Sequence, residues 1–335
     1  MKLQKLIERL VHLVPVLLGV SVIVFVMMSM TPGDPVKIML GDQNASAAQE
    51  AALRHDMGLD LPPIERFGHF LLNAARGNFG LSYFHRRPVI DVITERLAAT
   101  VELTLAALVI ALIVAIPLGV LAAVKRNSLL DKAATVTSLL GVSLPGFWFG
   151  IFLLIVFAVR LHVLPISGRI GFDVTVAPIT GFLLADSLLE GNFAAFWNAV
   201  RHLLLPAVTL GLPMAAILMR VTRTAMLDVL RQDYITFAEI KGLSRRRILF
   251  RHALKNALIP TLTVAAMETG TLLGGNMIVE TVFGWPGLGR LVVESIYVRD
   301  YPVVQTAVLL YALIYVLLNF AADLLYTIVN PKVQL

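Results

Sequence analysis

The sequence predicts an all-α, polytopic membrane protein with six transmembrane helices. Of its 335 residues, 58% are hydrophobic and only 15% are charged, whereas a soluble domain carries about 25% charged residues. Six apolar runs reach the roughly 20 residues that a helix needs to cross a bilayer. They cover about residues 10–30, 101–124, 133–159, 203–222, 257–281 and 303–329.

The distribution of lysine and arginine predicts that both termini are cytoplasmic. With the N-terminus inside, the inner loops and termini carry a net charge of +11 and the outer loops carry −1. The opposite orientation would place the basic clusters outside, against the positive-inside rule. The first apolar run is preceded by basic residues but lacks a small-residue cleavage site. We therefore interpret it as an uncleaved first span rather than a signal peptide.

Residues 31–99 are predicted to form a long external segment with two short helices. Ser46 and Gln49 fit a capping box that opens the first helix, and Gly58 ends it. Pro62 and Pro63 start the second helix. One face of this second helix is apolar and carries Ile64, Phe67, Leu71 and Ala74. Such a face either lies on the bilayer or packs on the spans, and we favour packing on the spans.

The longest polar interruption in the second half of the chain, residues 231–260, is basic and is therefore expected on the cytoplasmic side. Its pattern predicts two short helices broken at Gly242. The first apolar stripe contains Ile235, Ala238 and Leu243, and the second contains Ile248, Leu249, Ala253 and Leu254. A simple connection needs only about two to eight residues. The extra, amphipathic length indicates that the segment docks onto a soluble partner.

Several classes of chemistry lack their sequence signature. The dipeptide Gly-Lys does not occur, so the chain has no phosphate-binding P-loop. The seven histidines form no H-E-x-x-H motif, and G-x-S-x-G is absent. There is no cysteine, which excludes disulfides and thiolate chemistry. We therefore expect no enzymatic activity, no cofactor and no metal site.

Acidic residues in or at the edge of the spans mark candidate sites, because a charge near the bilayer centre costs at least about 2.5 kcal/mol on insertion scales. Glu102 and Glu280 lie near the outer ends of their spans, where a carboxylate reaches water. Glu268 lies about 11 residues into the fifth run, or roughly 17 Å from its start. It either lines a translocation path or is tied to a neighbouring helix. Glu268, Asn276 and Glu280 are the candidate path residues.

Residues 231–260 resemble the cytoplasmic "EAA" loop of ABC-importer permeases, in the form used by the dipeptide/oligopeptide/nickel branch. The matching segments are Asp233-Tyr234-Ile235, Ala238, Lys241-Gly242-Leu243-Ser244, Arg251-His252-Ala253-Leu254 and Asn256-Ala257-Leu258-Ile259-Pro260. Further matching segments are Pro32-Gly33-Asp34-Pro35, Ser143-x-Pro145-x-Phe147-Trp148 and Phe283-x-Trp285-Pro286-Gly287-Leu288-Gly289. The resemblance covers nearly the whole chain, and the dipeptide permeases are the most similar. Thr236, Phe237 and Lys255 depart from the wider loop pattern.

The resemblance implies a type I ABC-importer permease (MetI-like) fold. Residues 1–96 would be an N-terminal anchor helix plus the external amphipathic segment. Residues 97–330 would form the permease core, with the coupling loop at 223–256. The implied partners are a second homologous permease, two cytoplasmic ATPases and an external solute-binding protein, in a bacterial inner membrane.

The resemblance also implies a function, the import of dipeptides or short peptides driven by ATP. The residues implied in ATPase coupling are Asp233, Tyr234, Ala238, Glu239, Lys241, Gly242, Leu243, Ser244, Arg251 and His252. Permeases for nickel chelates and for glutathione-like peptides remain alternatives within this branch. An ion-coupled secondary transporter, with Glu268 carrying a proton, is the alternative from another class.

Overall fold

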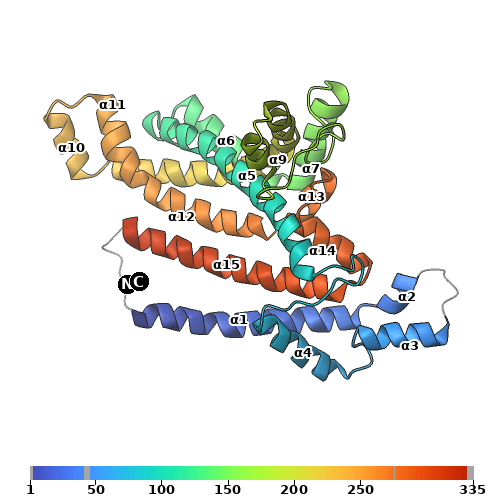
Figure 1. Ribbon diagram of the computed structural model, residues 1–335. Helices are drawn as coiled ribbons and strands as arrows, with labels where there is room; N and C mark the ends of the chain where they lie inside the picture. Colours follow the sequence, from blue (N-terminus) through green and yellow to red (C-terminus); the bar gives the residue numbers. More distant parts are fainter. Residues whose placement is uncertain (1–2, 41–45, 275, 330–335) are drawn as a thin grey trace. The chain divides into compact units, whose positions relative to one another are not determined.

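The computed structural model describes residues 3–40, 46–274 and 276–329, with side chains described from residue 14 to residue 321 except Val142. These residues form helices joined by turns and loops (Figure 1), and the β-pairing among them is an isolated bridge between Leu81 and Pro88. The all-α prediction is confirmed.

The first eight helices are α1 (Leu3–Met30), α2 (Pro35–Leu40), α3 (Ala47–Asp56), α4 (Pro63–Ala75), α5 (Val89–Val124), α6 (Leu129–Ser143), α7 (Gly146–Leu153) and the π-helix η1 (Leu154–Arg160). The remaining helices are α8 (Leu183–Leu189), α9 (Phe193–Val229), α10 (Asp233–Ile240), α11 (Arg245–Arg247), the π-helix η2 (Ile248–Ala253), α12 (Leu254–Leu273), α13 (Met277–Val282), α14 (Leu288–Tyr297) and α15 (Tyr301–Val329).

The chain divides into two compact units. Unit 1 contains Met1–Thr100, Gly274–Met277 and Pro286–Val316. Unit 2 contains Val101–Leu273, Ile278–Trp285 and Leu317–Leu335. The long helices α5 and α15 each contribute to both units.

The core of unit 1 forms where the first turns of α5 meet α14 and α15. Its buried side chains are Val89, Val92, Ile93, Leu288, Leu291, Val292, Val303 and Ala307. The helix α4 packs on α1, because the rings of Phe67 and Phe25 lie 5.1 Å apart. This contact confirms the packing prediction for the external amphipathic helix. Ile64, at the start of the predicted apolar face, is nevertheless exposed.

The predicted helix signals of the external segment are confirmed in unit 1. Ser46 and Gln49 form a reciprocal capping box at the start of α3. Gly58 adopts a left-handed backbone conformation (φ 64°) that ends this helix. Arg54 on α3 donates hydrogen bonds to Asp34 and Glu50. Burial alone would raise the pKa of Asp34, but the hydrogen bond and charge of Arg54 outweigh it and lower that pKa.

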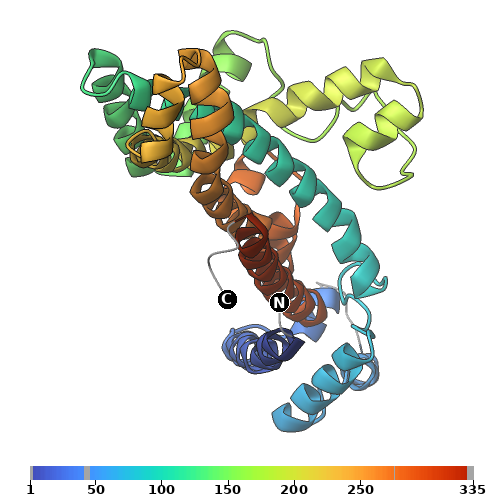
Figure 2. The same cartoon turned by 90° about the vertical axis from the view of Figure 1, so that its left-hand side faces the viewer.

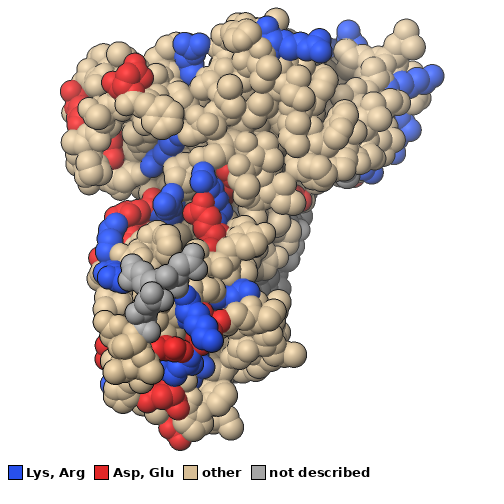
Figure 3. All heavy atoms as spheres, turned by 90° about the vertical axis from the view of Figure 1, so that its right-hand side faces the viewer, with Lys and Arg blue, Asp and Glu red and all other residues tan. Residues whose placement is uncertain are grey.

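Acidic and basic side chains are interspersed in the lower part of Figure 3.

Asp300 anchors the turn that precedes α5. Its carboxylate is fully buried and accepts hydrogen bonds from the Ser82 hydroxyl and from the backbone N–H groups of Tyr83 and Phe84, both at 3.1 Å. The Tyr83 hydroxyl in turn donates to the carbonyl of Met57 at 3.2 Å. Burial raises the pKa of Tyr83 to about 12. One buried carboxylate therefore orders a loop that is 216 or more residues away in the chain.

The core of unit 2 is built by close packing of α5, α9 and α12. Its buried side chains are mostly alanine and methionine: Ala111, Ala115, Met214, Ala215, Leu218, Met219 and Ala265. A Cβ on Gly211 would lie 2.7 Å from the carbonyl oxygen of Ala107, and one on Gly119 would lie 2.7 Å from the Cβ of Thr222. Glycine at these two positions therefore allows α9 to approach α5, as small residues do in membrane helix pairs.

Three helices are long and apolar enough to cross a membrane: Val89–Val124, Phe193–Val229 and Tyr301–Ala321. A fourth candidate is the pair Leu129–Gly141 and Gly146–Arg160, which is bent by 102°. Val14–Met30 is a shorter apolar helix. These criteria, which consider only length and composition in the described residues, give up to four of the six predicted spans.

Two predicted spans are interrupted, and the sequence explains each break. In the run 133–159, Pro145 disfavours helical geometry at the preceding residue, and Leu144 is accordingly extended (φ −80°, ψ 130°). In the run 257–281, α12 ends at Leu273, before a pair of glycines. The backbone of Gly274 lies so close to Tyr311 that a Cβ there would be 1.9 Å from the ring.

Replacing Asp300 tests its anchoring role. Asp300→Ala removes the acceptor for one hydroxyl and two backbone N–H groups, and we expect a loss of about 3 kcal/mol of stability, since hydrogen bonds to charged groups contribute about 1.5–3 kcal/mol each. Thermal unfolding in detergent and proteolysis near residues 78–88 would measure the effect. Asp300→Asn keeps one acceptor oxygen and should lose less. The exposed control Asp228→Ala should match the wild type, and an equally stable Asp300→Ala would contradict the role.

Candidate functional site

The basic segment of residues 230–256 folds as two short helical pieces between the long helices α9 and α12. The first piece is α10, and the second runs through α11 and η2 into α12. Gly242 lies between them with a left-handed φ of 72°, which confirms the predicted break. Nothing lies within 4 Å of a Cβ built at Gly242. The glycine is therefore required by backbone conformation and not by crowding.

The apolar stripes of this segment face the protein itself. Ile235, Ala238, Ile248 and Ala253 are buried in one cluster with Val120, Ala123, Met226 and Ala257 of α5, α9 and α12. Leu243, Leu249 and Leu254 pack against the same cluster. The predicted stripes are thus confirmed, and the protein itself covers them. The expected docking of this segment onto a soluble partner stays a prediction, and it would have to use another face of the segment. The stripes attach α10 and η2 to the spans (Figures 1 and 2).

A second, outward face remains for a partner. Its apolar residues are Phe237, Ile240 and Phe250, which are 57%, 77% and 59% exposed. Lys241 lies over the ring of Phe237 at 4.5 Å. Arg246, Arg247 and Arg251 line a shallow pocket together with Phe250, and Arg245 is also exposed. Large exposed apolar side chains ringed by charge are typical of protein interaction sites. We name this face the outer loop face.

The residues that the sequence singled out for coupling divide between the two faces. Ala238 is buried, and Leu243 and His252 are half-buried. Asp233, Tyr234, Glu239, Lys241, Gly242, Ser244 and Arg251 are exposed. Sequence reasoning missed Phe237, Ile240 and Phe250, although their position between the buried stripe residues was the available signal. An aromatic or large aliphatic residue outside the buried stripe must be exposed or covered by a partner.

Tyr234 and His252 have a bracing role within the segment. The hydroxyl of Tyr234 accepts a hydrogen bond from the Asn256 side chain at 2.7 Å and donates to the carbonyl of His252 at 3.4 Å. These contacts join α10 to η2 and to the first turn of α12. The hydroxyl of Tyr234 therefore ties the start of α10 to the start of α12.

The three candidate path residues lie in different environments. Glu268 is half-buried on α12, and its carboxylate forms no hydrogen bond or ion pair with the described residues. Asn276 is half-buried just before α13. Glu280 lies on α13 and is fully buried. The expectation that Glu280 reaches water is therefore wrong.

Glu102 also differs from its prediction, because it is buried in an ion pair and does not reach water. One carboxylate oxygen accepts hydrogen bonds from Nε and Nη2 of Arg169 at 3.0 and 2.6 Å. The other accepts from the backbone N–H of Leu184 at 2.7 Å. Arg169 also donates to the carbonyl of Gly181. The carboxylate thus ties the loop before α8 to α5, a contact that no local sequence pattern indicates.

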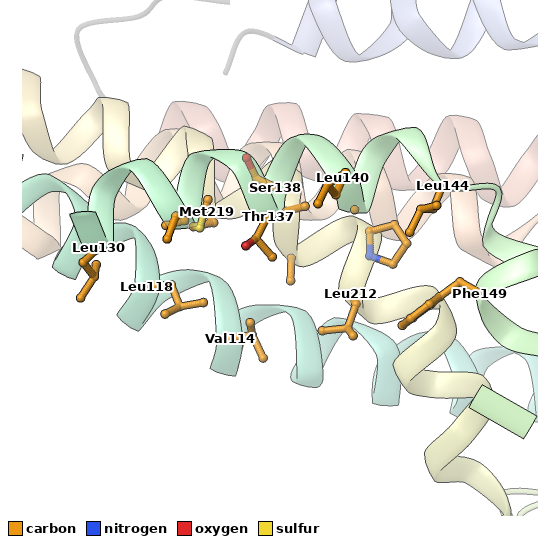
Figure 4. A pocket seen from close by; sticks show the side chains of 16 residues that line it. Val114, Leu118, Leu130, Thr137, Ser138, Leu140, Leu144, Phe149, Leu212 and Met219 are labelled. Atoms are coloured by element: carbon orange, nitrogen blue, oxygen red, sulfur yellow. The ribbon is translucent and has the colours of Figure 1, made fainter. Parts of the chain in front are cut away.

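An apolar groove runs along α6 in unit 2 (Figure 4). It has a volume of about 480 Å³, and its walls come from α5, α6, α7 and α9. Leu118, Leu130, Leu140, Leu144, Phe149 and Met219 line it, and no acidic or basic side chain does. None of the candidate path residues is in its lining. The groove is suited to apolar contacts and offers no group to neutralise a charged substrate.

A structural comparison identifies the class of fold. The chain resembles the solved structure titled "Inward facing conformations of the MetNI methionine ABC transporter", with a TM-score of 0.54 and 18% identity. The match covers 72% of this chain and 97% of that chain. The chain therefore shares the fold of that ABC-transporter chain, which agrees with the fold that the resemblance in the sequence implied.

Family models assign the chain more specifically. Residues 115–335 match the family described as "Binding-protein-dependent transport system inner membrane component", and residues 2–104 match its N-terminal counterpart. The chain belongs to this family. It is therefore a membrane component of a transport system, and the ion-coupled alternative is not supported.

Curated relatives match almost the entire chain. The di/tripeptide transport system permease protein DppB of Pseudomonas aeruginosa (strain UCBPP-PA14) is 43% identical over 327 residues, which are 98% of this chain and 97% of the relative. The dipeptide transport system permease protein DppB of Escherichia coli (strain K12) is 42% identical over 335 residues, with 99% of both chains covered. The glutathione transport system permease protein GsiC of Shigella flexneri serotype 5b (strain 8401) is 40% identical over 332 residues, again with 99% of both covered. These relatives are permeases, which are transport components rather than enzymes.

Proposed function

We propose that this chain is the transmembrane permease subunit of an ATP-driven importer of dipeptides or short peptides. The full-length relatives carry the assignment of substrate class, since those named for dipeptides are 42–43% identical over 98–99% of the chain. The outer loop face carries the assignment of mechanism, because it offers a partner surface on a chain that has no nucleotide-binding motif. One relative is named for glutathione, a peptide-like substrate, so import of glutathione-like peptides is the second candidate function.

The proposed complex contains a second homologous permease, two cytoplasmic ATPases and an external solute-binding protein. In it, the outer loop face seats in a groove of one ATPase, as a helix binds in a groove. Closure of the ATPase pair on ATP moves α10. The buried stripe and the Tyr234 brace then pass this movement to α9 and α12, which the loop joins covalently. Coupling of this kind links two global states of the transporter.

We further propose six spans, cytoplasmic termini and a bacterial inner-membrane location. In this arrangement, residues 1–96 are the anchor and external segment, and residues 97–330 are the core with its coupling loop at 223–256. Helix α1, the bent pair α6–α7–η1 and the interrupted pair α12–α13 then complete the set that α5, α9 and α15 begin. The charge asymmetry of +11 inside against −1 outside supports this orientation.

Single cysteines test the topology, since the chain has none of its own. Ala48→Cys lies on the exposed side of α3, and Ser244→Cys lies on the exposed loop. On intact cells with an opened outer membrane, an impermeant thiol reagent should label the first and not the second. Both should be labelled after full permeabilisation. Labelling of Ser244→Cys from outside would overturn the orientation.

Gly242 variants test the coupling role. Gly242→Val places a β-branched residue in the left-handed region, at a cost of roughly 1–2 kcal/mol, and should rotate η2 relative to α10. The chain should still insert, but uptake of labelled dialanine and the stimulation of ATPase activity by the loaded binding protein should fall at least severalfold.

Gly242→Asn is the matched control for this experiment, because asparagine tolerates left-handed geometry better than other residues with a Cβ and a Cβ at this position meets open space. It should retain most of the activity. Normal uptake and normal stimulation in Gly242→Val would show that this loop does not carry the coupling.

Glu268 is proposed to face the translocation path, because its carboxylate lies on the apolar helix α12, in its second half, and is unpaired among the described residues. Glu268→Gln should change dialanine uptake while leaving assembly with the partner subunits intact, as measured by co-purification. The exposed Glu65→Gln on α4 is the control and should leave both unchanged. If Glu268→Gln abolishes assembly, the residue holds helices together and the path role is wrong.

A further inference from the structure

Unit 1 contains a second cavity that is different in character from the groove of unit 2. It has a volume of about 720 Å³ and lies among α1, α3, α4, the 78–86 turn and the start of α15. Ligand sites usually measure about 300–1,000 Å³ and combine apolar walls with a few polar groups. Here the walls include Phe70, Phe79 and Tyr83. The polar groups include Asp56, Arg66, His69, Asn73, Asn78 and Gln305.

Arg66 is the central cation of this cavity. Its guanidinium lies 5.8 Å from the ring centroid of Phe25 and 6.0 Å from that of Tyr301, which is within the range of cation–π contacts. The two rings hold the side chain, but they do not satisfy its N–H donors. The guanidinium of Arg66 forms no hydrogen bond or ion pair with any residue whose side chain is described. A half-buried guanidinium held in this way is suited to accept a carboxylate in a bidentate pair.

Gln305 provides an independent observation at the same cavity. Its side chain is only 9% exposed, and it lines the cavity from α15. Its amide has no hydrogen-bond partner in the described part of the chain. The amide atoms are not among the fully buried, unpaired side-chain atoms of the described residues. They therefore keep access to the cavity and are available to a donor or acceptor supplied from it.

We propose that this cavity binds a short peptide through its C-terminal carboxylate, as a permease subsite separate from the solute-binding protein. Arg66 pairs with the carboxylate, and Gln305 hydrogen-bonds the peptide amide. The aromatic walls take an apolar side chain, and Asp56 offers an anion for the ammonium group. The lining carries two arginines, Arg66 and Arg86, and one carboxylate, Asp56. Together with the amide of Gln305 and the apolar walls, this set matches a short peptide with a C-terminal carboxylate and an ammonium group. The choice of a peptide rests on the proposed function, and its external location rests on the proposed topology.

The test measures direct binding to the assembled permease–ATPase complex in nanodiscs, without the solute-binding protein. Calorimetric titration uses the dipeptide Ala-Phe, its C-terminal amide and inorganic phosphate. Wild type should bind Ala-Phe at least about tenfold more tightly than the amide, because a hydrogen-bonded charge is lost in the amide. This comparison needs no protein variant, so it is independent of any folding defect.

Protein variants then locate the carboxylate. Arg66→Gln should weaken binding of Ala-Phe at least about tenfold and leave binding of the amide nearly unchanged. Gln305→Leu should weaken both ligands. The matched control is Arg76→Gln, which removes an exposed arginine at the end of the same helix that does not line the cavity. It should bind both ligands as wild type does.

Several results would overturn the inference. The proposed subsite is wrong if Ala-Phe does not bind, or if Ala-Phe and its amide bind equally well. It is also wrong if phosphate binds more tightly than Ala-Phe, or if Arg66→Gln changes only the stimulation of ATPase activity by the binding protein. Uptake of dialanine by the complete system separates this inference from the proposed function. Uptake without direct binding refutes the subsite alone. Absence of any peptide uptake refutes the proposed function and the peptide as ligand together.

Discussion

The burial of one face of the inner loop against the spans is the interaction on which the rest of the mechanism depends. Ile235 and Ile248 are nearly fully buried between α5, α9 and α12. Full burial of two such side chains contributes about 3–6 kcal/mol. This is enough to make α10 and η2 an extension of the spans rather than a flexible connection. Because the inner face is fixed in this way, the proposed coupling needs no contact between the outer loop face and the long helices themselves.

Polar side chains inside unit 2 form hydrogen bonds that lower the free-energy cost of burying them among apolar helices. Thr209 and Thr222 donate to the carbonyls of Leu205 and Leu218 on their own helix, at 2.8 and 2.7 Å. The hydroxyls of Thr222 and Thr261 also lie 3.0 Å apart, which joins α9 to α12. Such hydrogen bonds hold membrane helices together where apolar burial gives little advantage. Among the described residues of α12, the carboxylate of Glu268 is unpaired, which is why we propose it for the translocation path.

The part of unit 1 between α1 and α5 depends on a few long-range contacts. Asp300 orders the 82–84 turn, and Arg66 is held between two aromatic rings. One of these two rings belongs to Tyr301, which is buried in a cluster with Met28 and Val304 and also lines the cavity that contains Arg66. Packing of α1 and α15 in unit 1 therefore also shapes the wall of the proposed peptide subsite. A scaffold that is rigid on one side and open on the other is what a binding site requires.

The sequence by itself determined the helical class, the charge asymmetry, the capping of α3 and the break at Gly242, because each depends on local composition or on neighbours within one or two turns. The motifs of the inner loop also determined the family. Only the tertiary structure decided what covers the apolar stripes of that loop. An amphipathic pattern predicts that one face is covered, but it does not say whether the same chain or a partner covers it. It also decided that Glu102 pairs with Arg169, 67 residues away, and that Gln305 and Arg66 line one cavity. Contacts between distant segments leave no periodic signal in a single sequence, so they emerge only once the chain has folded.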